Sequence, residues 1–457
     1  MSSEPPGPLI ALISSTCSQK HAINRGFKSL AHLIYPFTTH ECSLREPVEN
    51  TKISHRVRLD IRDITSDGHL LTLSVLPYVL IQALKNFTDV TKSIKLFRDV
   101  LSRWAEPSEH ESFGHYLACV FVISTQDENP LGELSKMIQT QQTLYNTTST
   151  LMIPGHCAAP KWAAPHAKTP RHYILLHDSR CPRGSVERRD DVFAQMCSTY
   201  GTDNCQVLQL DSDSESSEMK GAWQEIDEFN DVLEKGLEEA HRHSSDSIPS
   251  APGTNNASLN SPTSFVSTIS SAMSSNVGSV SPPTPPTLSN PIVWKSSPKV
   301  ASMSDAQNVQ KVLARFLSNC LAPHVEQEIR TLYENAGQKK SISKSVASVT
   351  MGLSKWLRTG SSSNNLATPI TYSWESLEMQ KRRLADLFMM FGLSGAAYDQ
   401  YHPLKKDLET DKAMAAHAVA LEMCALALHN AQPHLNAKQF PIRYLDPPVK
   451  LLIEHAK

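Results

Sequence analysis

Apolar runs of strand length alternate with helical segments over the first 240 residues, and this rhythm leaves few architectures open. The run Tyr116–Ile123 (YLACVFVI) is continuously apolar and rich in valine and isoleucine, as is typical of a strand covered on both faces. Shorter runs of the same kind are Leu9–Ile13, Tyr173–Leu176 and Val207–Leu210. Strands that alternate with helices favour a mainly parallel sheet with helices on its faces.

The helices of this region are marked by apolar spacing and by their ends. Asn129-Pro130 offers an N-cap followed by a proline in the first turn, and Gly201 follows the helix expected over Arg188–Tyr200 as a C-cap. Further helices are expected over Val90–Trp104 and Trp223–Ala240. By contrast, Leu70–Leu80 is a candidate for additional sheet interrupted by Pro77, and SSTCSQKHAI after Leu9–Ile13 is expected to form a loop.

The composition changes from about Ser244 to Pro291, where serine, threonine, proline and asparagine dominate and charge is almost absent. Such a stretch cannot bury enough apolar surface to offset its ordering entropy, so we predict a disordered linker. Beyond it the pattern is helical. The expected helices are Asp305–Glu334, Glu375–Phe391, Ala396–Leu408 and Ala413–His429. The last two are rich in alanine, and pairs of short helices with small residues where they cross are typical of the start of an α-solenoid.

These patterns predict an α+β multidomain protein, with an N-terminal α/β domain, a disordered linker and the α-helical start of a solenoid. The expected segments are residues 1–240 for the α/β domain, 241–300 for the linker, 301–337 for a helical segment, 338–360 for a basic amphipathic segment and 371–457 for the solenoid-like region.

The segment Gln338–Arg358 (QKKSISKSVASVTMGLSKWLR) is basic and amphipathic. It has no acidic residue, and its larger apolar residues recur at steps of four and three, the period of an α-helix. This composition is typical of a helix at a membrane–water boundary. We expect Ile342, Val346, Val349, Leu353, Trp356 and Leu357 to insert into the lipid, and Lys339, Lys340, Lys344, Lys355 and Arg358 to hold anionic headgroups.

Other interpretations of this segment stay open. Basic amphipathic segments also dock on partner proteins, and many are ordinary surface helices. Gly352 and the β-branched residues weaken an isolated helix, so the segment can also be disordered until it meets a surface.

Composition excludes several classes of protein. The formal net charge of the 457 residues is −2, which argues against a nucleic-acid binder. The nine cysteines are scattered and form no CxxC pair, so neither a disulfide framework nor a zinc ribbon is expected, and a reducing cytosol fits best. The N-terminus does not resemble a secretory signal and no apolar run is long enough to span a bilayer, so any membrane association is expected to be peripheral.

No pattern for catalysis emerges. The sequence has no GxxxxGK[ST], HExxH, GxSxG or GxGxxG motif, and we expect no cofactor, no metal and no enzymatic activity. His177-Asp178 ends a strand, where active sites of parallel sheets often lie, but such a pair more often caps the next turn. His156 and Cys157 are neighbours without a third catalytic partner.

Several blocks in a fixed order resemble the N-terminal half of the TRAPP-complex subunit 85 family, the subunit that distinguishes TRAPP complex III. The blocks are Pro107–Thr125, Asn129–Met137 (NPLGELSKM), Pro160–Trp162 (PKW), His172–Asp178 (HYILLHD), Thr199–Ser212 (TYGTDNCQVLQLDS), Val312–Leu332, Lys340–Arg358, Leu384–Leu408 and Ala418–His429. Two features depart from the family, whose members are far longer and have no counterpart of the Ser/Pro insert.

The resemblance implies a non-catalytic subunit that joins the core TRAPP subunits. That core acts as an exchange factor for a Rab-family GTPase in ER–Golgi transport and autophagy, and the subunit helps to bring it to an anionic membrane surface. The implied location is cytoplasmic, peripherally associated with Golgi and early secretory membranes and the phagophore assembly site. The alternatives are a soluble scaffold whose basic helix docks a partner, and an α/β enzyme with His177 and Asp178 at its site.

Overall fold

The computed structural model describes residues 7–45, 52–65, 74–103, 113–147, 169–212, 219, 221–245, 299–350, 372–432 and 445–455, with only the backbone for 101–103, 143–147, 241, 337–350, 452 and 454–455. The chain forms two compact units, Met1–Leu237 with Pro298–Lys457, and Glu238–Ser297. The described part of the second unit is the end of helix α7 (Gln224–Ser245), in which Arg242 and Glu239 form an ion pair of 2.8 Å. The other described elements belong to the first unit.

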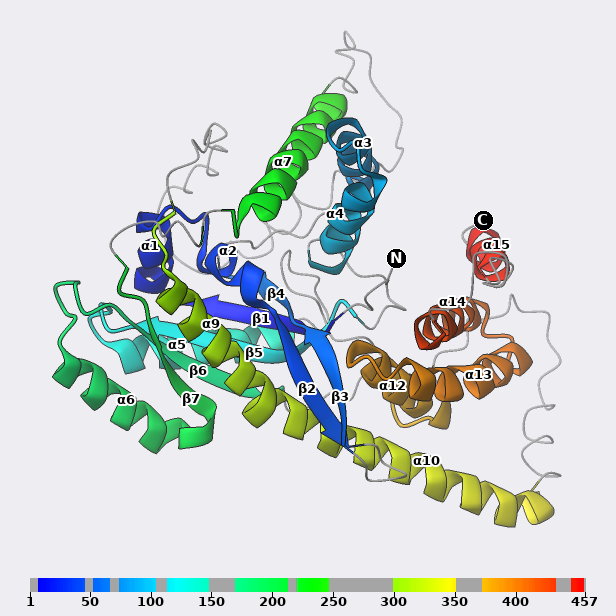
Figure 1. Cartoon of the computed structure of the whole chain (residues 1–457). Coiled ribbons are helices and arrows are strands. Elements are labelled where there is room, and N and C mark those ends of the chain that lie inside the picture. Colours follow the sequence, from blue (N-terminus) through cyan, green and yellow to red (C-terminus); the bar gives the residue numbers. More distant parts are fainter. Residues whose placement is uncertain are drawn as a thin grey trace, which may run out of the picture. The chain divides into compact units, whose positions relative to one another are not determined.

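Five parallel strands form the main sheet of the first unit (Figure 1), in the order β4-β1-β5-β6-β7. They are β1 (Leu9–Ser14), β4 (Asp60–Asp63), β5 (Tyr116–Ser124), β6 (Arg171–His177) and β7 (Cys205–Gln209). In the register of the sheet, Val120 of β5 pairs with Leu12 of β1 and His172 of β6. The mainly parallel sheet predicted from the sequence is therefore confirmed, and the four apolar runs correspond to β1, β5, β6 and β7.

Alternate side chains of the sheet enter two separate cores. Ala11, Phe121 and Leu175 pack with residues of α5 (Pro130–Thr147) and α6 (Val186–Tyr200). Ile10, Leu12 and Val122 join a larger core that also contains α2 (Leu30–Ile34) and the C-terminal helices. Because both faces of the sheet are covered, its strands are apolar at nearly every position.

The expected helix ends are confirmed for α5 and α6. Helix α5 begins at Pro130, and α6 ends at Gly201, whose φ of 88° is the left-handed conformation that suits glycine at a C-cap. The Ser185 hydroxyl accepts a hydrogen bond from the Arg188 amide (3.1 Å) and caps the other end of α6.

Two sequence expectations are wrong. The loop expected after Leu9–Ile13 is mostly helix α1 (Thr16–Asn24), because the Ser15 hydroxyl accepts a hydrogen bond from the Ser18 amide (3.2 Å) and caps a helix that starts directly after β1. The sheet considered for Leu70–Leu80 is, from Leu76 onward, helix α3 (Leu76–Asn86). Pro77 lies in its first turn, where a missing N–H costs nothing.

A separate hairpin links the sheet region to the C-terminal helices. It consists of β2 (Thr39–Arg45) and β3 (Lys52–Arg58), which pair antiparallel. Strand β2 contacts α9 (Met303–Phe316) and α10 (Ala322–Thr350), and the Arg45 amide donates to the Glu326 carboxylate (2.8 Å). No pattern noted in the sequence pointed to this hairpin.

Helices α9 and α10 are joined by a π-helical turn, Leu317–Leu321, within the helical stretch expected over Asp305–Glu334. Pro323 follows this turn and cannot donate to the carbonyl four residues before it. A widened turn just before a proline relieves the clash between its ring and that carbonyl, which accounts for the π-turn here.

The remaining helices pack in succession. They are α12 (Leu377–Met390), α13 (Ser394–Thr410), α14 (Met414–Ala431) and α15 (Asp446–His455). The first three confirm the helices expected from Glu375 to His429. Buried Asp386 of α12 accepts a hydrogen bond from the Tyr401 hydroxyl of α13, so this polar pair is satisfied inside the core. The larger core runs without interruption from the sheet to α14.

Some sequence expectations lie outside the described residues, namely the linker after Ser245 and the pair His156 and Cys157. Among the helices that are described, none combines the length and the apolar character that crossing a bilayer requires.

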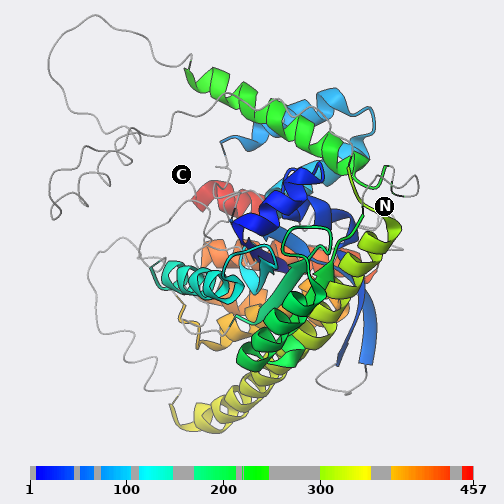
Figure 2. The ribbon, with the colours of Figure 1, turned by 90° about the vertical axis from the view of Figure 1, so that its left-hand side faces the viewer.

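Helix α7 approaches α3 closely because Gly236 has no side chain. Figures 1 and 2 both show α7 alongside α3 and α4 (Val90–Arg103). A Cβ atom at Gly236 would lie 2.8 Å from the Val79 Cα of α3, a contact that forces backbone to move. The apolar side chains of Val232 and Phe229 join Val79 in the core between these helices.

We therefore predict that Gly236→Ala lowers the free energy of unfolding by about 1–3 kcal/mol, because overpacking outweighs the gain of about 1 kcal/mol in helix propensity. Gly395→Ala in α13 is the matched control, since a Cβ there meets nothing within 4 Å, and it should be neutral or stabilising. Urea unfolding of both variants tests this, and equal effects of the two substitutions would contradict it.

Candidate functional site

The carboxyl ends of the parallel strands are the natural place for a site in this sheet. The order β4-β1-β5-β6-β7 is that of a doubly wound sheet, in which ligands bind beyond the strand ends where the order reverses, between β1 and β5. In this sheet, that place corresponds to the turn after β1 and to the side chains that gather beyond β6 and β7.

The turn after β1 leaves no loop to wrap a phosphate. Only Ser15 separates β1 from α1, and its amide donates to the Val122 carbonyl of β5 (2.8 Å). The Ser18 hydroxyl donates to the same carbonyl (3.4 Å). These bonds draw the start of α1 against β5, at the point where nucleotide-binding proteins of this architecture place a glycine-rich loop.

A buried arginine organises the space beyond β6 and β7. Arg25 follows α1 and is 5% exposed. Its Nη2 donates to the Asp178 Oδ2 (2.9 Å) and to the Leu210 carbonyl (2.6 Å), and its Nη1 lies 3.4 Å from the Asp305 Oδ2. One guanidinium thus joins the end of α1, the ends of β6 and β7, and the start of α9. We call these residues, with His21, the Arg25 cluster.

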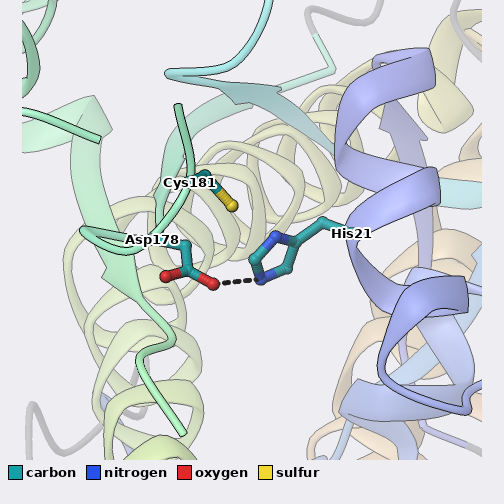
Figure 3. Close-up of side chains that lie close together, drawn as sticks. All are labelled: His21, Asp178 and Cys181. Carbon is teal, nitrogen blue, oxygen red and sulfur yellow. Dashed lines mark ion pairs between the residues drawn. The ribbon is translucent and has the colours of Figure 1, made fainter. Parts of the chain in front are cut away.

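His21 is held neutral in this cluster. Its Nε2 accepts a hydrogen bond from the Arg25 Nε–H (3.0 Å), so the imidazole carries its proton on Nδ1. Burial and the adjacent Arg25 charge lower the pKa of His21 to about 4, although Asp178 pulls in the opposite direction. The Asp178 Oδ2 lies 3.6 Å from the same nitrogen (Figure 3).

Asp178 is held ionised and Cys181 is held protonated. Burial alone would raise the pKa of Asp178, but hydrogen bonds from Arg180 and Arg25 outweigh it and lower that pKa to about 2. Burial, reinforced by the Asp178 charge, raises the pKa of the Cys181 thiol. The Asp178 Oδ1 also accepts from the Arg180 amide (3.0 Å), which confirms that Asp178 caps the turn after its strand.

His21, Asp178 and Cys181 have the residue types of a metal site but do not fit one. Their ligand atoms lie within 4.8 Å of one another (Figure 3). However, Arg25 already donates to the His21 Nε2 and the Asp178 Oδ2, the atoms that a cation would need. A metal ion would have to displace a buried guanidinium that has three further partners, or bury its charge beside it. The cluster is therefore an ion-pair network.

Asp305 binds both ends of the segment that connects β7 to α9. Its carboxylate accepts from the Asp211 amide (3.0 Å) and from the Ser212 hydroxyl. It also accepts from the Ser302 amide (3.2 Å), while the Ser302 hydroxyl accepts from the Asp305 amide, which forms a capping box at the start of α9. Ser212, near the start of this connecting segment, and Ser302, near its end, therefore both donate to the Asp305 carboxylate.

His177 points to the neighbouring strand end and not to the Arg25 cluster. It is fully buried, and its Nδ1 lies 3.3 Å from the Thr125 hydroxyl after β5. Burial lowers the pKa of His177, so it is neutral. The structure therefore does not bring His177 and Asp178 together as a catalytic pair, although they are adjacent in sequence.

Some of the residues predicted to bind membrane lie within the described part of the chain, and the others lie outside it. Lys339, Lys340, Ile342, Lys344, Val346 and Val349 lie on the helical backbone of α10, which ends at Thr350. Leu353, Lys355, Trp356, Leu357 and Arg358 lie outside the described residues. The membrane role of this set stays a prediction.

The Arg25 cluster was not predicted from the sequence. Arg25 meets partners 153 and 280 positions away, a pairing that no local pattern carries. The one available signal was the spacing of Ser302 and Asp305, which is that of a capping box ahead of an apolar helix.

Comparison with known proteins gives consistent matches. The family model described as "ER-Golgi trafficking TRAPP I complex 85 kDa subunit" matches residues 3–457. The chain is 71% identical over 461 residues to trafficking protein particle complex subunit 8 of Caenorhabditis elegans, covering 100% of the chain and 35% of the relative. It is 25% identical over 496 residues to the Homo sapiens subunit of the same name, covering 96% and 33%. The chain thus spans about a third of the length of these relatives.

Removing the Arg25 charge is predicted to destabilise the fold. Arg25→Met removes the Arg25 cation from the buried Asp305 carboxylate and leaves the Asp178 carboxylate paired with Arg180 but not with Arg25, and we expect a loss of about 3–5 kcal/mol in the free energy of unfolding. Arg183→Met is the control at the same edge of the sheet, because Arg183 is 43% exposed and pairs with exposed Glu128, and it should cost under about 1 kcal/mol. Chemical denaturation measures both, and similar losses would show that the cluster is dispensable.

His21 should make the fold sensitive to mild acid. Its pKa is lowered to about 4 in the fold, so the unfolded chain binds the proton more readily. Stability from this group is complete above about pH 6.5 and falls as the pH drops towards 4, by about 1.4 kcal/mol per pH unit for one proton. His21→Gln keeps an acceptor but cannot titrate, so unfolding measured across this range should show a shallower decline. Parallel curves for variant and wild type would contradict this role.

Proposed function

The chain belongs to the family of the ER–Golgi trafficking TRAPP complex 85 kDa subunit, and from this premise we propose that it is a non-catalytic subunit of TRAPP complex III. In this role it recruits a Rab guanine-nucleotide exchange complex to membranes in ER–Golgi transport and autophagy. The family description names complex I, so the assignment to complex III is part of the proposal. The proposed partners are the core TRAPP subunits, an anionic membrane surface and, indirectly, a Rab-family GTPase.

The observation that supports the membrane role is the basic amphipathic sequence pattern of 338–358. Its residues up to Thr350 lie on helix α10, whose first half is packed in the fold. The first half of α10 buries Val325 and Ile329 completely. Glu328 of the same half pairs with Arg383 of α12 (2.8 Å). The backbone then continues as helix to Thr350, about 20 Å beyond the buried Ala336. Because this part of the helix is already formed, it would present the apolar stripe of Ile342, Val346 and Val349 to the lipid without the unfavourable step of helix nucleation.

The non-catalytic role is supported by the chemistry at the strand ends. The turn after β1 is closed by Ser15 and Ser18, and the space beyond β6 and β7 is filled by the Arg25 cluster. Cys181 is held protonated, and the His21 lone pair is occupied by Arg25. Both groups are thereby poorly suited to act as a nucleophile or a base. The cytoplasmic location, with peripheral association at Golgi, early secretory and phagophore assembly membranes, follows from the proposed role.

Vesicle flotation of the full chain tests the membrane role. Wild type should float with vesicles that contain phosphatidylserine, and Leu353→Asp with Trp356→Asp should weaken binding at least about tenfold. Each large apolar side chain contributes roughly 1.5–3 kcal/mol on burial, so losing two of them exceeds that factor. Raising the salt concentration should weaken the wild type as well, because the lysines act through screened charge.

The matched control is Val449→Asp with Ile453→Asp on α15. It also replaces two apolar residues by aspartate, at positions whose side chains are exposed. This variant should float like the wild type. If the stripe variant binds vesicles as well as the wild type does, the membrane assignment fails. If it binds vesicles normally but loses a partner subunit, the segment is a protein-docking helix in a soluble scaffold.

A further inference from the structure

Serines and acidic residues alternate directly after β7, over residues 211–218 (DSDSESSE), and no basic residue occurs before Lys220. Kinases choose substrates partly by charge, and a kinase with a basic substrate groove favours a serine that is followed by carboxylates. Ser212 has Asp213 directly after it and Glu215 three positions after it. The other three serines of the run lack an acidic residue at one or both of these positions. The charge pattern therefore favours Ser212 as a phosphate acceptor.

The structure describes Ser212 and shows what its hydroxyl does. The side chain is partly exposed, and the hydroxyl donates a hydrogen bond to the Asp305 carboxylate at the start of α9. The amide of the preceding Asp211 donates to the other oxygen of that carboxylate (3.0 Å). Within the described part of the chain, the Ser212 backbone has no hydrogen-bond partner. The hydroxyl can therefore leave Asp305 without the loss of any strand or helix hydrogen bond.

A phosphate on Ser212 would oppose the contact with Asp305. The serine would lose the hydrogen that it donates and would gain a charge of about −1.5 to −2. Its present acceptor is a carboxylate that is 5% exposed, so two like charges would meet where little water screens them. The carboxylate of Asp211, directly before it in the chain, adds to the negative charge. The phosphate is therefore expected to move away from Asp305.

The cations of this region are already engaged. Arg25 and Arg180 both pair with Asp178, at 2.9 and 3.1 Å. Lys299, close to the start of α9, pairs with Asp227. A phosphate on the segment after β7 would gain one of these cations only at the expense of an ion pair that exists in the fold. Repulsion from the carboxylates is therefore expected to decide the outcome.

We propose that Ser212 is a phosphorylation site for an acidophilic serine kinase, and that its phosphate separates the segment after β7 from the start of α9. In the reaction, the Ser212 Oγ attacks the γ-phosphorus of MgATP, the bond from that phosphorus to ADP breaks, and the hydroxyl proton passes to the base of the kinase. The proposal is independent of the proposed function, because it concerns the packing of the chain itself. Asp305 also pairs with Arg25, so the modification acts on a contact between the sheet and α9.

Treatment of the full chain with casein kinase 2, an acidophilic kinase, and MgATP tests the site. Mass spectrometry of peptides should find phosphate on Ser212. Asp213→Asn with Glu215→Gln should lower the rate at this serine at least about tenfold, because these changes remove charge and keep size. A synthetic peptide of residues 207–218 is the reference for a chain without the fold. A serine that is modified in the peptide but not in the full chain would be hidden by the fold, and the proposal would fail. It would also fail if the rate did not depend on the two acidic residues.

Hydrogen exchange of the phosphorylated chain tests the structural effect. The Asp211 amide, which donates to Asp305, should exchange at least about tenfold faster after modification. Ser212→Ala treated with the same kinase is the matched control, because the other three serines can still be modified, and its Asp211 amide should exchange as it did before treatment. Unchanged exchange in the phosphorylated wild type would mean that Asp305 keeps its contacts. Slower exchange would mean that a cation such as Arg180 holds the phosphate. Either result overturns the proposed release.

Discussion

The described fold depends on how one buried guanidinium is satisfied. Arg25 is almost completely removed from water, and a charge in that position is tolerated only with matched partners. Those partners are Asp178 after β6, the Leu210 carbonyl after β7 and Asp305 in α9. Because they come from both sides of the insert, the network can form only when α9 has docked on the sheet. The C-terminal helices then share a continuous core with the strands.

The Arg25 cluster occupies the carboxyl ends of β6 and β7. In a doubly wound architecture the strand ends are where a ligand would bind, and here the protein's own groups take that space. Asp178 serves Arg25 and the turn after β6, and Asp305 binds the chain as it leaves and re-enters around the insert. The strand ends thus contribute to holding the fold together. The surface that we propose acts on another molecule is helical, namely the extension of α10 to Thr350.

Much of the fold could be predicted from local sequence patterns. Strand β5 was evident because a strand covered on both faces is apolar throughout, and α5 and α6 were evident from Pro130 and Gly201. Helix α1 was mistaken for a loop because a run of small polar residues is typical of both a loop and an N-cap, and only the Ser15 to Ser18 hydrogen bond decides between them. Pro77 suggested a broken strand, whereas it starts helix α3.

The interior pairings could not be predicted in the same way. Nothing near Arg25 in the sequence indicates Asp178 or Asp305, since tertiary contact alone brings them together. The helix expected over Val90–Trp104 likewise gave no sign of which side of α4 would be covered. Val100 is buried against α7 while Ile94 is exposed, so burial depends on which side of α4 faces α7.

We propose that the chain acts by adhesion, with the extension of α10 lying on lipid. Spin labels placed one at a time along residues 342–349 of the full chain, with oxygen and a water-soluble nickel chelate as relaxing agents, measure the depth of each position. With phosphatidylserine vesicles, labels at Ile342, Val346 and Val349 should become accessible to oxygen, while labels at Lys344 and Ser348 stay accessible to the chelate. Accessibility that does not change on adding vesicles, or that shows no helical period, would contradict the claim.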